Sequence, residues 1–178
     1  MSTIKRLELV AAIEQCRAVK SAAAELPGKS LTATLNKLLT GEFIAIHEYT
    51  GHYAVTKNLG YNKLAAGIKE RLDDELKHAN MLTYRIVFLG GDPTVDGKID
   101  AEVGKTVPKQ FELDKAKELG AVQDYNDAIQ QAIKAGDAVT RAMLESIVKD
   151  EDDHVDEIST AQDQITQMGI GQYLVTQV

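Results

Sequence analysis

Apolar side chains recur with a helical period through four long stretches of the chain. In each stretch they are spaced three or four residues apart, which places them on one face of an α-helix. The stretches are residues 31–58, 61–89, 108–135 and 137–168, and a looser apolar stripe covers residues 3–25. Aromatic residues make up only 5% of the chain, which favours a helical bundle over a β-sandwich. The pattern predicts an all-α fold, a four-helix bundle with an extra N-terminal helix.

Glycine and proline mark the ends of the helices. Gly60 and Gly136 leave room only for short turns, so the first helix should pair with the second, and the third with the fourth, as antiparallel hairpins. Residues 92–106 have no helical period and predict a long crossover, after which the third helix runs parallel to the second. Ser30 and Asp137 are candidate N-caps for the first and fourth helices.

The length of the chain indicates a single bundle domain preceded by a short extension. A chain of 178 residues is long enough for one domain with a sizeable core. Pro27-Gly28 separates an N-terminal helical extension, residues 1–29, from the bundle of residues 30–178. The extension is mildly basic, and both a docked extra helix and a targeting or DNA-tethering arm are compatible with it.

Charge and cysteine content narrow the classes of function. A net charge of −7 disfavours a general nucleic-acid-binding surface. Cys16 is the only cysteine, so one chain cannot build an internal disulfide or a cysteine-based zinc site. No apolar run is long enough to span a membrane, and no segment is typical of a signal peptide. We therefore expect a cytoplasmic protein that does not bind membranes.

Glutamates interrupt the apolar stripes in a pattern that occurs twice. A Glu-x-x-His pair, whose two side chains share one helix face, is preceded by another glutamate 33 residues earlier. A tyrosine follows that earlier glutamate by seven residues. The two copies, offset by 76 residues, are Glu42, Tyr49, Glu75 and His78 in the first half and Glu118, Tyr125, Glu151 and His154 in the second. Two hairpins related by a pseudo-twofold axis would bring both copies together.

Four carboxylates and two imidazoles are the ligand set of a di-iron or di-manganese bundle. Two divalent ions carry four positive charges, which the four glutamates cancel. Without metal, four carboxylates in a bundle core would be costly and would take up protons. The simpler alternative, four surface glutamates on amphipathic helices, conflicts with their positions within the apolar stripes. The residues therefore predict a two-metal site in the bundle core.

Several stretches around these residues resemble bacterioferritins, in the ferritin-like superfamily. The resemblance covers about residues 31–178 and leaves residues 1–29 outside. It is carried by Leu35-Asn36-Lys37-Leu38-Leu39 with Glu42, Asp74-Glu75-Leu76-Lys77-His78-Ala79, Arg85-Ile86-Val87-Phe88-Leu89, Asp150-Glu151-Asp152-Asp153-His154-Val155-Asp156 and Gln167-Met168-Gly169-Ile170-Gly171-Gln172-Tyr173-Leu174. The last of these looks like the short C-terminal helix of that family. The resemblance implies a ferritin-like bundle.

The same resemblance implies a di-iron centre with two irons per subunit. The implied ligands are Glu42 and Glu118 as terminal ligands, Glu75 and Glu151 as bridges, and His78 and His154 on one iron each. Tyr49 matches a tyrosine beside the family's site. A tyrosine at the position of Tyr125 resembles rubrerythrins more than bacterioferritins. Core packing with a satisfied hydroxyl is the alternative for both tyrosines. The remaining histidines, His47 and His52, are interpreted as surface or packing residues.

Haem binding is the point at which the chain departs from the family. The family's haem ligand is a methionine directly after the glutamate of the second helix, and Leu76 stands there instead. A tryptophan often found in the family after the last ligand histidine is replaced by Glu157. Leu76 offers a similar volume without a donor atom, so we expect a protein without haem.

These residues and the resemblance favour a ferroxidase that oxidises Fe(II) with O2 or hydrogen peroxide for iron storage and detoxification. The resemblance implies a homo-oligomeric shell of 24 subunits. Two alternatives are a di-iron peroxidase of rubrerythrin type and a DNA-protecting mini-ferritin. The first normally carries a cysteine-rich electron-transfer domain, which one cysteine cannot form. The second shares its metal site between subunits, whereas this chain supplies all six ligands itself. A non-catalytic shell subunit would be expected to lack these ligands.

Overall fold

The computed structural model describes residues 28–97 and 101–178. Four long helices and a short one account for most of these residues. Their bounds are α2, Gly28–Asn58; α3, Asn62–Phe88; α4, Val107–Lys134; α5, Ala138–Met168; and α6, Ile170–Val175. The predicted helix over residues 3–25 lies outside the described residues, and the boundary of the N-terminal extension stays a prediction. The predicted bundle and its short C-terminal helix are confirmed.

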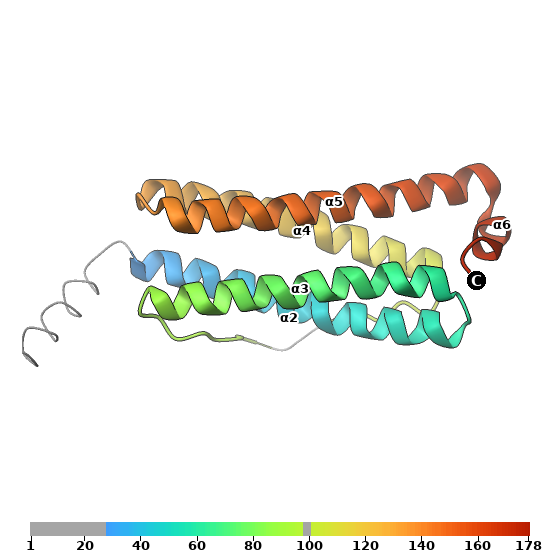
Figure 1. Cartoon of the computed structure of the whole chain (residues 1–178), viewed down its shortest axis with the longest axis horizontal. Helices are drawn as coiled ribbons and strands as arrows, with labels where there is room; N and C mark the ends of the chain where they lie inside the picture. The colour runs from blue at the N-terminus through green and yellow to red at the C-terminus, as the bar shows by residue number, and fades with distance from the viewer. Residues whose placement is uncertain (1–27, 98–100) are drawn as a thin grey trace, which may run out of the picture.

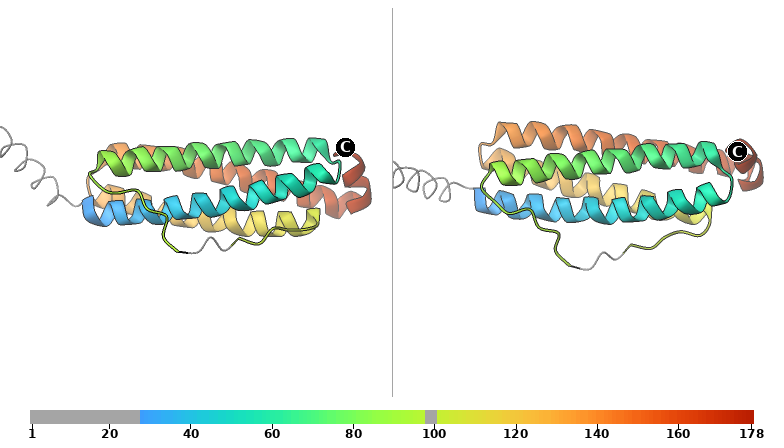
Figure 2. Two further views of the ribbon diagram at one scale, coloured as in Figure 1. Left: turned by 90° about the horizontal axis from the view of Figure 1, so that it is seen from below. Right: turned by 60° about the horizontal axis from the view of Figure 1, so that its bottom comes forward.

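The helices form two hairpins that lie side by side (Figure 1). Helices α2 and α3 make one hairpin, α4 and α5 make the other, and α2 packs on α4 while α3 packs on α5. The crossover runs outside the bundle along α2, as Figure 2 shows. It is anchored there by the Asn36 side chain, which donates to the carbonyl oxygen of Asp92 and accepts from the Thr94 backbone N–H. The crossover therefore spans the bundle, and α4 starts at the end where α3 starts.

Turn chemistry explains the ends of the helices. Gly60 and Gly136 adopt φ values of +85° and +68°, the left-handed conformation that ends a helix at little cost for glycine. Asp137 caps α5 as predicted, because its side chain accepts a hydrogen bond from the Thr140 backbone N–H. The predicted cap at Ser30 is wrong, because α2 already begins at Gly28 and Ser30 lies within its first turn.

Two apolar cores fill the two ends of the bundle. One, at the end that holds the α4–α5 turn, contains thirteen buried residues, among them Leu35, Leu82 and Ile147. The other, at the end that holds the α2–α3 turn and α6, includes Ile68, Phe111 and Ile158. Between these cores lie six buried polar residues: Glu42, Glu75, His78, Glu118, Glu151 and His154. Within the described residues, no helix is long and apolar enough to cross a membrane.

Candidate metal centre

All four long helices contribute to one buried polar cluster midway along the bundle. Helix α2 supplies Glu42 and α4 supplies Glu118, while α3 and α5 each supply a glutamate and, one turn later, a histidine. The six side chains are almost fully buried, with at most 4% of any residue exposed. The structure thus brings together all six residues that the sequence predicts as ligands.

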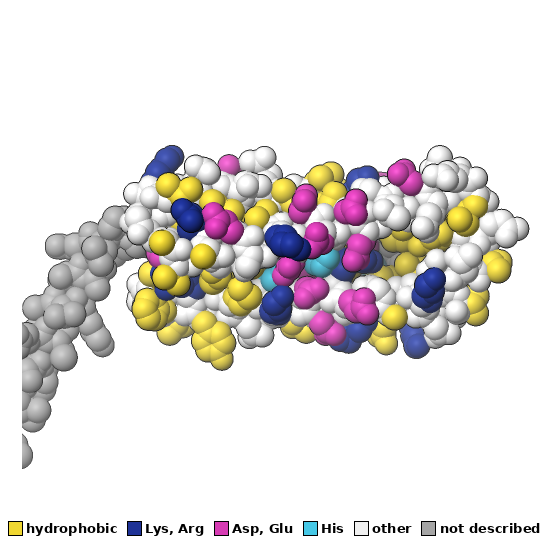
Figure 3. All heavy atoms as spheres, turned by 45° about the horizontal axis from the view of Figure 1, so that its top comes forward, with side chains coloured by type: hydrophobic (Ala, Val, Ile, Leu, Met, Phe, Trp, Pro, Cys, Tyr) yellow, Lys and Arg dark blue, Asp and Glu magenta, His cyan; other side chains and the backbone are white. Residues whose placement is uncertain are grey.

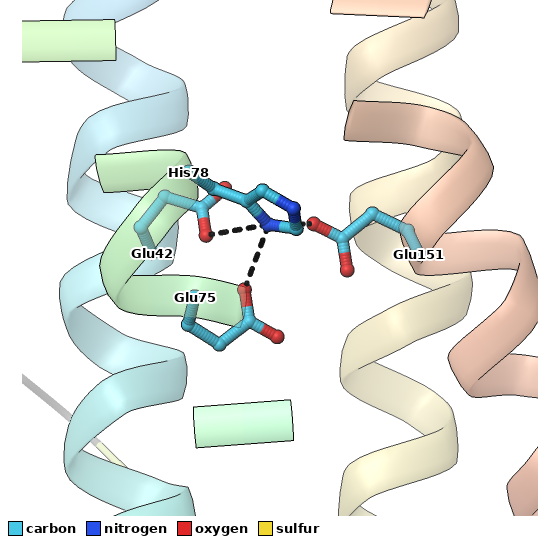
Figure 4. Close-up of side chains that lie close together, drawn as sticks. All are labelled: Glu42, Glu75, His78 and Glu151. Atoms are coloured by element: carbon cyan, nitrogen blue, oxygen red, sulfur yellow. Dashed lines mark hydrogen bonds and ion pairs between the residues drawn. The ribbon is translucent and has the colours of Figure 1, made fainter. Parts of the chain in front are cut away.

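One half of the cluster surrounds the ring of His78, which Figure 4 shows between three carboxylates. The Nδ1 atom of His78 lies 3.1 Å from Glu151 Oε1, 3.4 Å from Glu75 Oε2 and 3.8 Å from Glu42 Oε2. Ligand atoms of these four residues all lie within 4.8 Å of one another. This group joins α2 and α3 to α5.

The other half repeats this arrangement around His154. The Nδ1 atom of His154 lies 3.5 Å from Glu151 Oε2, 3.7 Å from Glu75 Oε1 and 3.8 Å from Glu118 Oε2. Ligand atoms of these residues also lie within 4.8 Å of one another. Both groups include Glu75 and Glu151, and each of these glutamates turns one oxygen to each histidine. Two groups that share two carboxylates have the arrangement required to bridge a pair of ions.

The hydrogen bonding inside the cluster also fits a pair of metal ions. Within the part of the chain that the structure describes, Glu42 Oε2, Glu75 Oε1, both Glu151 oxygens and His154 Nδ1 have no hydrogen-bond partner. Buried polar atoms are rarely left unpaired, so these atoms suit a bound cation. Carboxylates with one imidazole per ion suit iron, manganese or zinc in the divalent state.

Two tyrosines form a reciprocal pair of hydrogen bonds between the hairpins. Tyr49 on α2 donates to Oε1 of Glu118 on α4, and Tyr125 on α4 donates to Oε1 of Glu42 on α2. Each glutamate that belongs to only one group is thereby oriented by the tyrosine of the opposite hairpin. Both tyrosines are buried core residues as well, so packing and hydrogen bonding coexist at these positions.

Two aspartates that the sequence analysis did not assign to the centre lie beside the outer nitrogens of the histidines. His78 Nε2 lies 3.2 Å from Asp150 Oδ2, and His154 Nε2 lies 3.6 Å from Asp74 Oδ2. A carboxylate on the far ring nitrogen fixes the orientation of a metal-binding histidine. The signal was present in the sequence, because an aspartate directly precedes both repeated glutamates, again 76 residues apart.

Without metal, the cluster holds protons that ions would displace. Burial, together with the neighbouring carboxylates, raises the pKa of Glu42 and Glu75 well above the usual range. Burial also raises the pKa of Glu118 to about 7. Although burial opposes it, the neighbouring His154 and His78 lower the pKa of Glu151 to about 2. Burial likewise opposes the shift at His154, but the neighbouring carboxylates of Glu118 and Glu151 raise its pKa to about 11.

Pockets reach the cluster from two faces of the bundle. A pocket of about 610 Å³ between α2 and α4 extends from Lys37, Glu102 and Asp124 to all four glutamates of the centre. A smaller pocket of about 180 Å³ between α3 and α5 is lined by His154 and by acidic residues. Figure 3 shows the acidic side chains gathered over the middle of that face, with histidine visible between them. The larger pocket therefore leads to the buried glutamates, and the smaller one leads to His154.

The other two histidines differ from each other. His47 is exposed, in line with a surface residue. His52 is fully buried and hydrogen-bonded to Asp114, a contact that sequence reasoning missed. A polar residue on the apolar face of α4, one turn before Glu118, was the available signal.

Comparison with known proteins agrees with this geometry. Residues 32–168 match the family described as the ferritin-like domain. A bacterioferritin of Streptomyces coelicolor is 33% identical over 142 residues, which is 80% of this chain and 85% of that protein. Bacterioferritins of Mycobacterium tuberculosis and Brucella melitensis are 33% and 30% identical over 76% and 78% of this chain, and over 85% and 86% of their own lengths. The chain belongs to the ferritin-like family and, within it, to the bacterioferritins.

Proposed function

We propose that the chain is a ferroxidase that oxidises Fe(II) at a di-iron centre within each subunit, for iron storage and detoxification. The observation that carries the proposal is the pair of buried four-residue groups that share Glu75 and Glu151. Glu42 and His78 would complete the binding of one ion, and Glu118 and His154 that of the other. All six residues come from one chain, which disfavours a mini-ferritin, whose metal site is shared between subunits.

Two bound Fe(II) ions can each supply one electron to a single oxidant. Transfer of two electrons and two protons converts O2 to hydrogen peroxide, and the same transfer converts hydrogen peroxide to two molecules of water. Pairing the ions avoids the release of one-electron radical products. Glu75 and Glu151, which both groups share, would hold the ions close together.

The protein side chains prepare the site for this charge. Fe(II) must displace protons from Glu42 and Glu75, whose pKa values burial raises well above the usual range. Tyr49 and Tyr125 keep one oxygen of each terminal glutamate occupied, so that the other oxygen faces the ion. Asp150 and Asp74 hold the histidine rings with Nδ1 turned toward the glutamates.

The proposal includes a homo-oligomeric shell in the cytoplasm, with 24 subunits as in the resembling family. Support comes from large apolar side chains exposed on the outer face of α3: Leu76, Tyr84, Val87 and Phe88 are 42%, 75%, 57% and 77% exposed. An exposed apolar face of this kind is typical of a protein–protein contact.

We also propose that this contact carries no haem. Leu76 lies on the exposed face of α3, where a methionine would have to supply its sulfur, and leucine has no donor atom. Met81 cannot substitute for it, because it is partly buried and packs against the apolar core. An absorbance spectrum of the purified protein without a Soret band is the expected result, and a stoichiometric six-coordinate haem would contradict it.

The test of the ferroxidase proposal is a stopped-flow titration with Fe(II). The fast phase of Fe(III) absorbance should saturate at two Fe(II) per chain, because the cluster comprises two groups of ligands. Glu118→Ala should lower the rate of the fast phase at least about a hundredfold while the helical content is retained. Glu112→Ala, an exposed glutamate on the same helix, serves as the control and should leave the phase unchanged.

An unchanged fast phase in the Glu118→Ala variant would rule out the proposed ligand set. The titration should be run with O2 and with hydrogen peroxide in separate arms. Oxidation of Fe(II) in the peroxide arm alone would identify hydrogen peroxide as the oxidant of the ferroxidase.

A further inference from the structure

A third group of buried ionisable side chains lies beside the centre, between α2 and α4. It consists of Glu48 and His52 on α2 and Asp114 on α4, whose potential ligand atoms lie within 4.8 Å of one another. These residues are 4%, 0% and 2% exposed. Asp114 precedes Glu118 by one helical turn, and Glu48 directly precedes Tyr49. The group is therefore adjacent to the Tyr49–Glu118 hydrogen bond but shares no residue with the two-metal cluster.

His52 holds the carboxylate of Asp114 in place. The backbone N–H of Gly104 donates to His52 Nε2 at 2.8 Å, so this nitrogen acts as an acceptor and Nδ1 carries the ring proton. Nδ1 lies 2.7 Å from Asp114 Oδ1 and donates to it. Both ring nitrogens are thus occupied. Asp114 Oδ2 has no hydrogen-bond partner within residues 28–97 and 101–178.

Glu48 provides a second free carboxylate oxygen. Its Oε1 also has no hydrogen-bond partner in the described part of the chain. The only cation near it there is Lys117, whose Nζ lies 3.9 Å from the other oxygen, Oε2. Burial and the negative charge of Asp114 raise the pKa of Glu48 against the opposing effect of Lys117. Two nearly buried carboxylates with unpaired oxygens would be relieved by a bound cation.

Packing of the bundle does not require this polar group. The 76-residue repeat places Asp124, Ala128 and Leu38 at the positions that correspond to Glu48, His52 and Asp114. Ala128 and Leu38 are buried members of an apolar core, and Asp124 is exposed. The same place in the other half of the bundle is therefore filled without a buried charge.

A cation can reach Glu48 from solvent. Glu48 lines the pocket of about 610 Å³ between α2 and α4. Glu102 and Asp124, both exposed, line the same pocket and give its mouth acidic groups, beside the lysines Lys37 and Lys117.

We propose that Glu48 and Asp114 bind a third divalent metal ion, separate from the two-metal centre. Glu48 Oε1 and Asp114 Oδ2 are its protein ligands, their two negative charges balance the ion, and His52 is a positioning residue. Oxygen ligands of this kind select hard cations such as Mn(II), Fe(II) or Mg(II). The proposal is independent of whether the neighbouring centre oxidises iron.

The test is a crystal structure of the full chain prepared with Mn(II) as the probe, with anomalous scattering used to locate the ions. We expect an anomalous peak between Glu48 Oε1 and Asp114 Oδ2, in addition to those at the two-metal centre. The Glu48→Gln/Asp114→Asn variant should lose only this peak, since asparagine can still accept the hydrogen bond from His52. Asp124→Asn is the matched control, because it removes a charge from the same pocket at the repeat-related position, and should retain the peak.

Calorimetric titration with Mn(II) provides a second measurement that needs no crystal. Glu48→Gln alone should weaken the third binding event at least about tenfold and leave the other two within experimental error. The proposal is overturned if no ion lies between the two carboxylates at a Mn(II) concentration that fills the two-metal centre. A Lys117 ammonium group found between them in place of an ion would overturn it as well.

Discussion

The two ends of the bundle share the same helical pattern but differ in the polar side chains that they bury. At the α4–α5 turn end, Thr140 is the only polar side chain among the described residues that is fully buried. At the α2–α3 turn end, several polar side chains are buried: Glu48, His52, Thr56, Arg71, Gln110 and Asp114. Arg71 pairs with Glu157, and Thr56 donates to Gln110, which in turn donates to the Gly104 carbonyl.

The repeat makes this difference informative. Arg71 corresponds to Ile147 and Thr56 to Ala132, and both counterparts are buried apolar residues. The centre itself keeps the repeat, because each group of ligands, each tyrosine and each aspartate has a counterpart. The symmetry of the bundle is therefore retained where two ions would bind and lost elsewhere. Several buried charged residues at one end, matched by apolar residues at the other, point to a role that the scaffold does not impose.

The largest effect is expected when the buried charge of Arg71 is introduced at the corresponding position of the other end. Ile147→Arg puts a guanidinium group at a fully buried apolar position. In the repeat, Met81 corresponds to Glu157, the partner of Arg71, so the new guanidinium group would have no matching carboxylate. We expect the free energy of unfolding to fall by at least about 4 kcal/mol, or the chain to remain unfolded. Circular dichroism during urea unfolding of the metal-free protein measures this loss.

The reverse exchange is the control for that experiment. Arg71→Met removes the partner of Glu157, whose side chain is 62% exposed and keeps its hydration. The loss should stay below about 1.5 kcal/mol. Equal losses for the two variants would show that the ends do not differ in their tolerance of charge.

Metal ions should stabilise the symmetric centre to an intermediate extent. Zn(II) at a hundredfold excess over its dissociation constant is expected to add about 2.7 kcal/mol per bound ion to the stability of the metal-free protein. The pKa of Glu118 is about 7, and those of Glu42 and Glu75 are raised well above the usual range, so protons compete with Zn(II) at neutral and acidic pH. The increase in melting temperature caused by Zn(II) should therefore be smaller at pH 5.5 than at pH 7.5.

Thermal melts at the two pH values, with and without Zn(II), provide the measurement. The sign follows from the competition, because every proton that remains on a glutamate in the metal-free cluster has to leave when the ion binds. A Zn(II) effect that does not depend on pH would mean that the ion binds somewhere other than these carboxylates.

The tyrosines should produce the smallest effects, and these should match each other. Tyr49→Phe and Tyr125→Phe each remove one hydroxyl that orients a terminal glutamate. We expect each variant to lose about 1 kcal/mol of stability and to bind one of its ions at least about tenfold more weakly. Tyr53→Phe, one turn beyond Tyr49 on α2, is the control. Losses of affinity that differ more than about tenfold between the two variants would show that the difference between the ends extends into the centre.

Helical periodicity was sufficient to predict the bundle, the hairpin pairing and the residues that gather in the core. A polar side chain within an apolar stripe must face the interior, so the sequence showed that Glu42 and Glu118 point inward. Periodicity does not say which atoms meet across helices. Such contacts depend on the stagger of the helices. Examples are the hydrogen bonds of Tyr49 and Tyr125 to glutamates of the opposite hairpin, and the contacts of Asp74 and Asp150 with the histidines.

The group around Glu48 was missed for a related reason. Asp114 occupies an apolar face of α4 in the sequence, but its partners His52 and Gly104 come from α2 and from the crossover. The path of a loop without helical period cannot be derived from its composition. Val103 shows how closely this loop approaches α2, because a Cβ atom at Gly51 would overlap with its side chain.

The two tyrosine–glutamate hydrogen bonds also link the hairpins when the subunit unfolds. Pulling α2 and α3 away from α4 and α5 must break both tyrosine–glutamate bonds and remove Glu75 and Glu151 from any ions between them. In a loaded subunit the hairpins cannot separate until the ions leave, so release of the ions limits the rate of unfolding. The lifetime of the folded subunit would then depend on how well it is supplied with metal, even where its equilibrium stability already suffices.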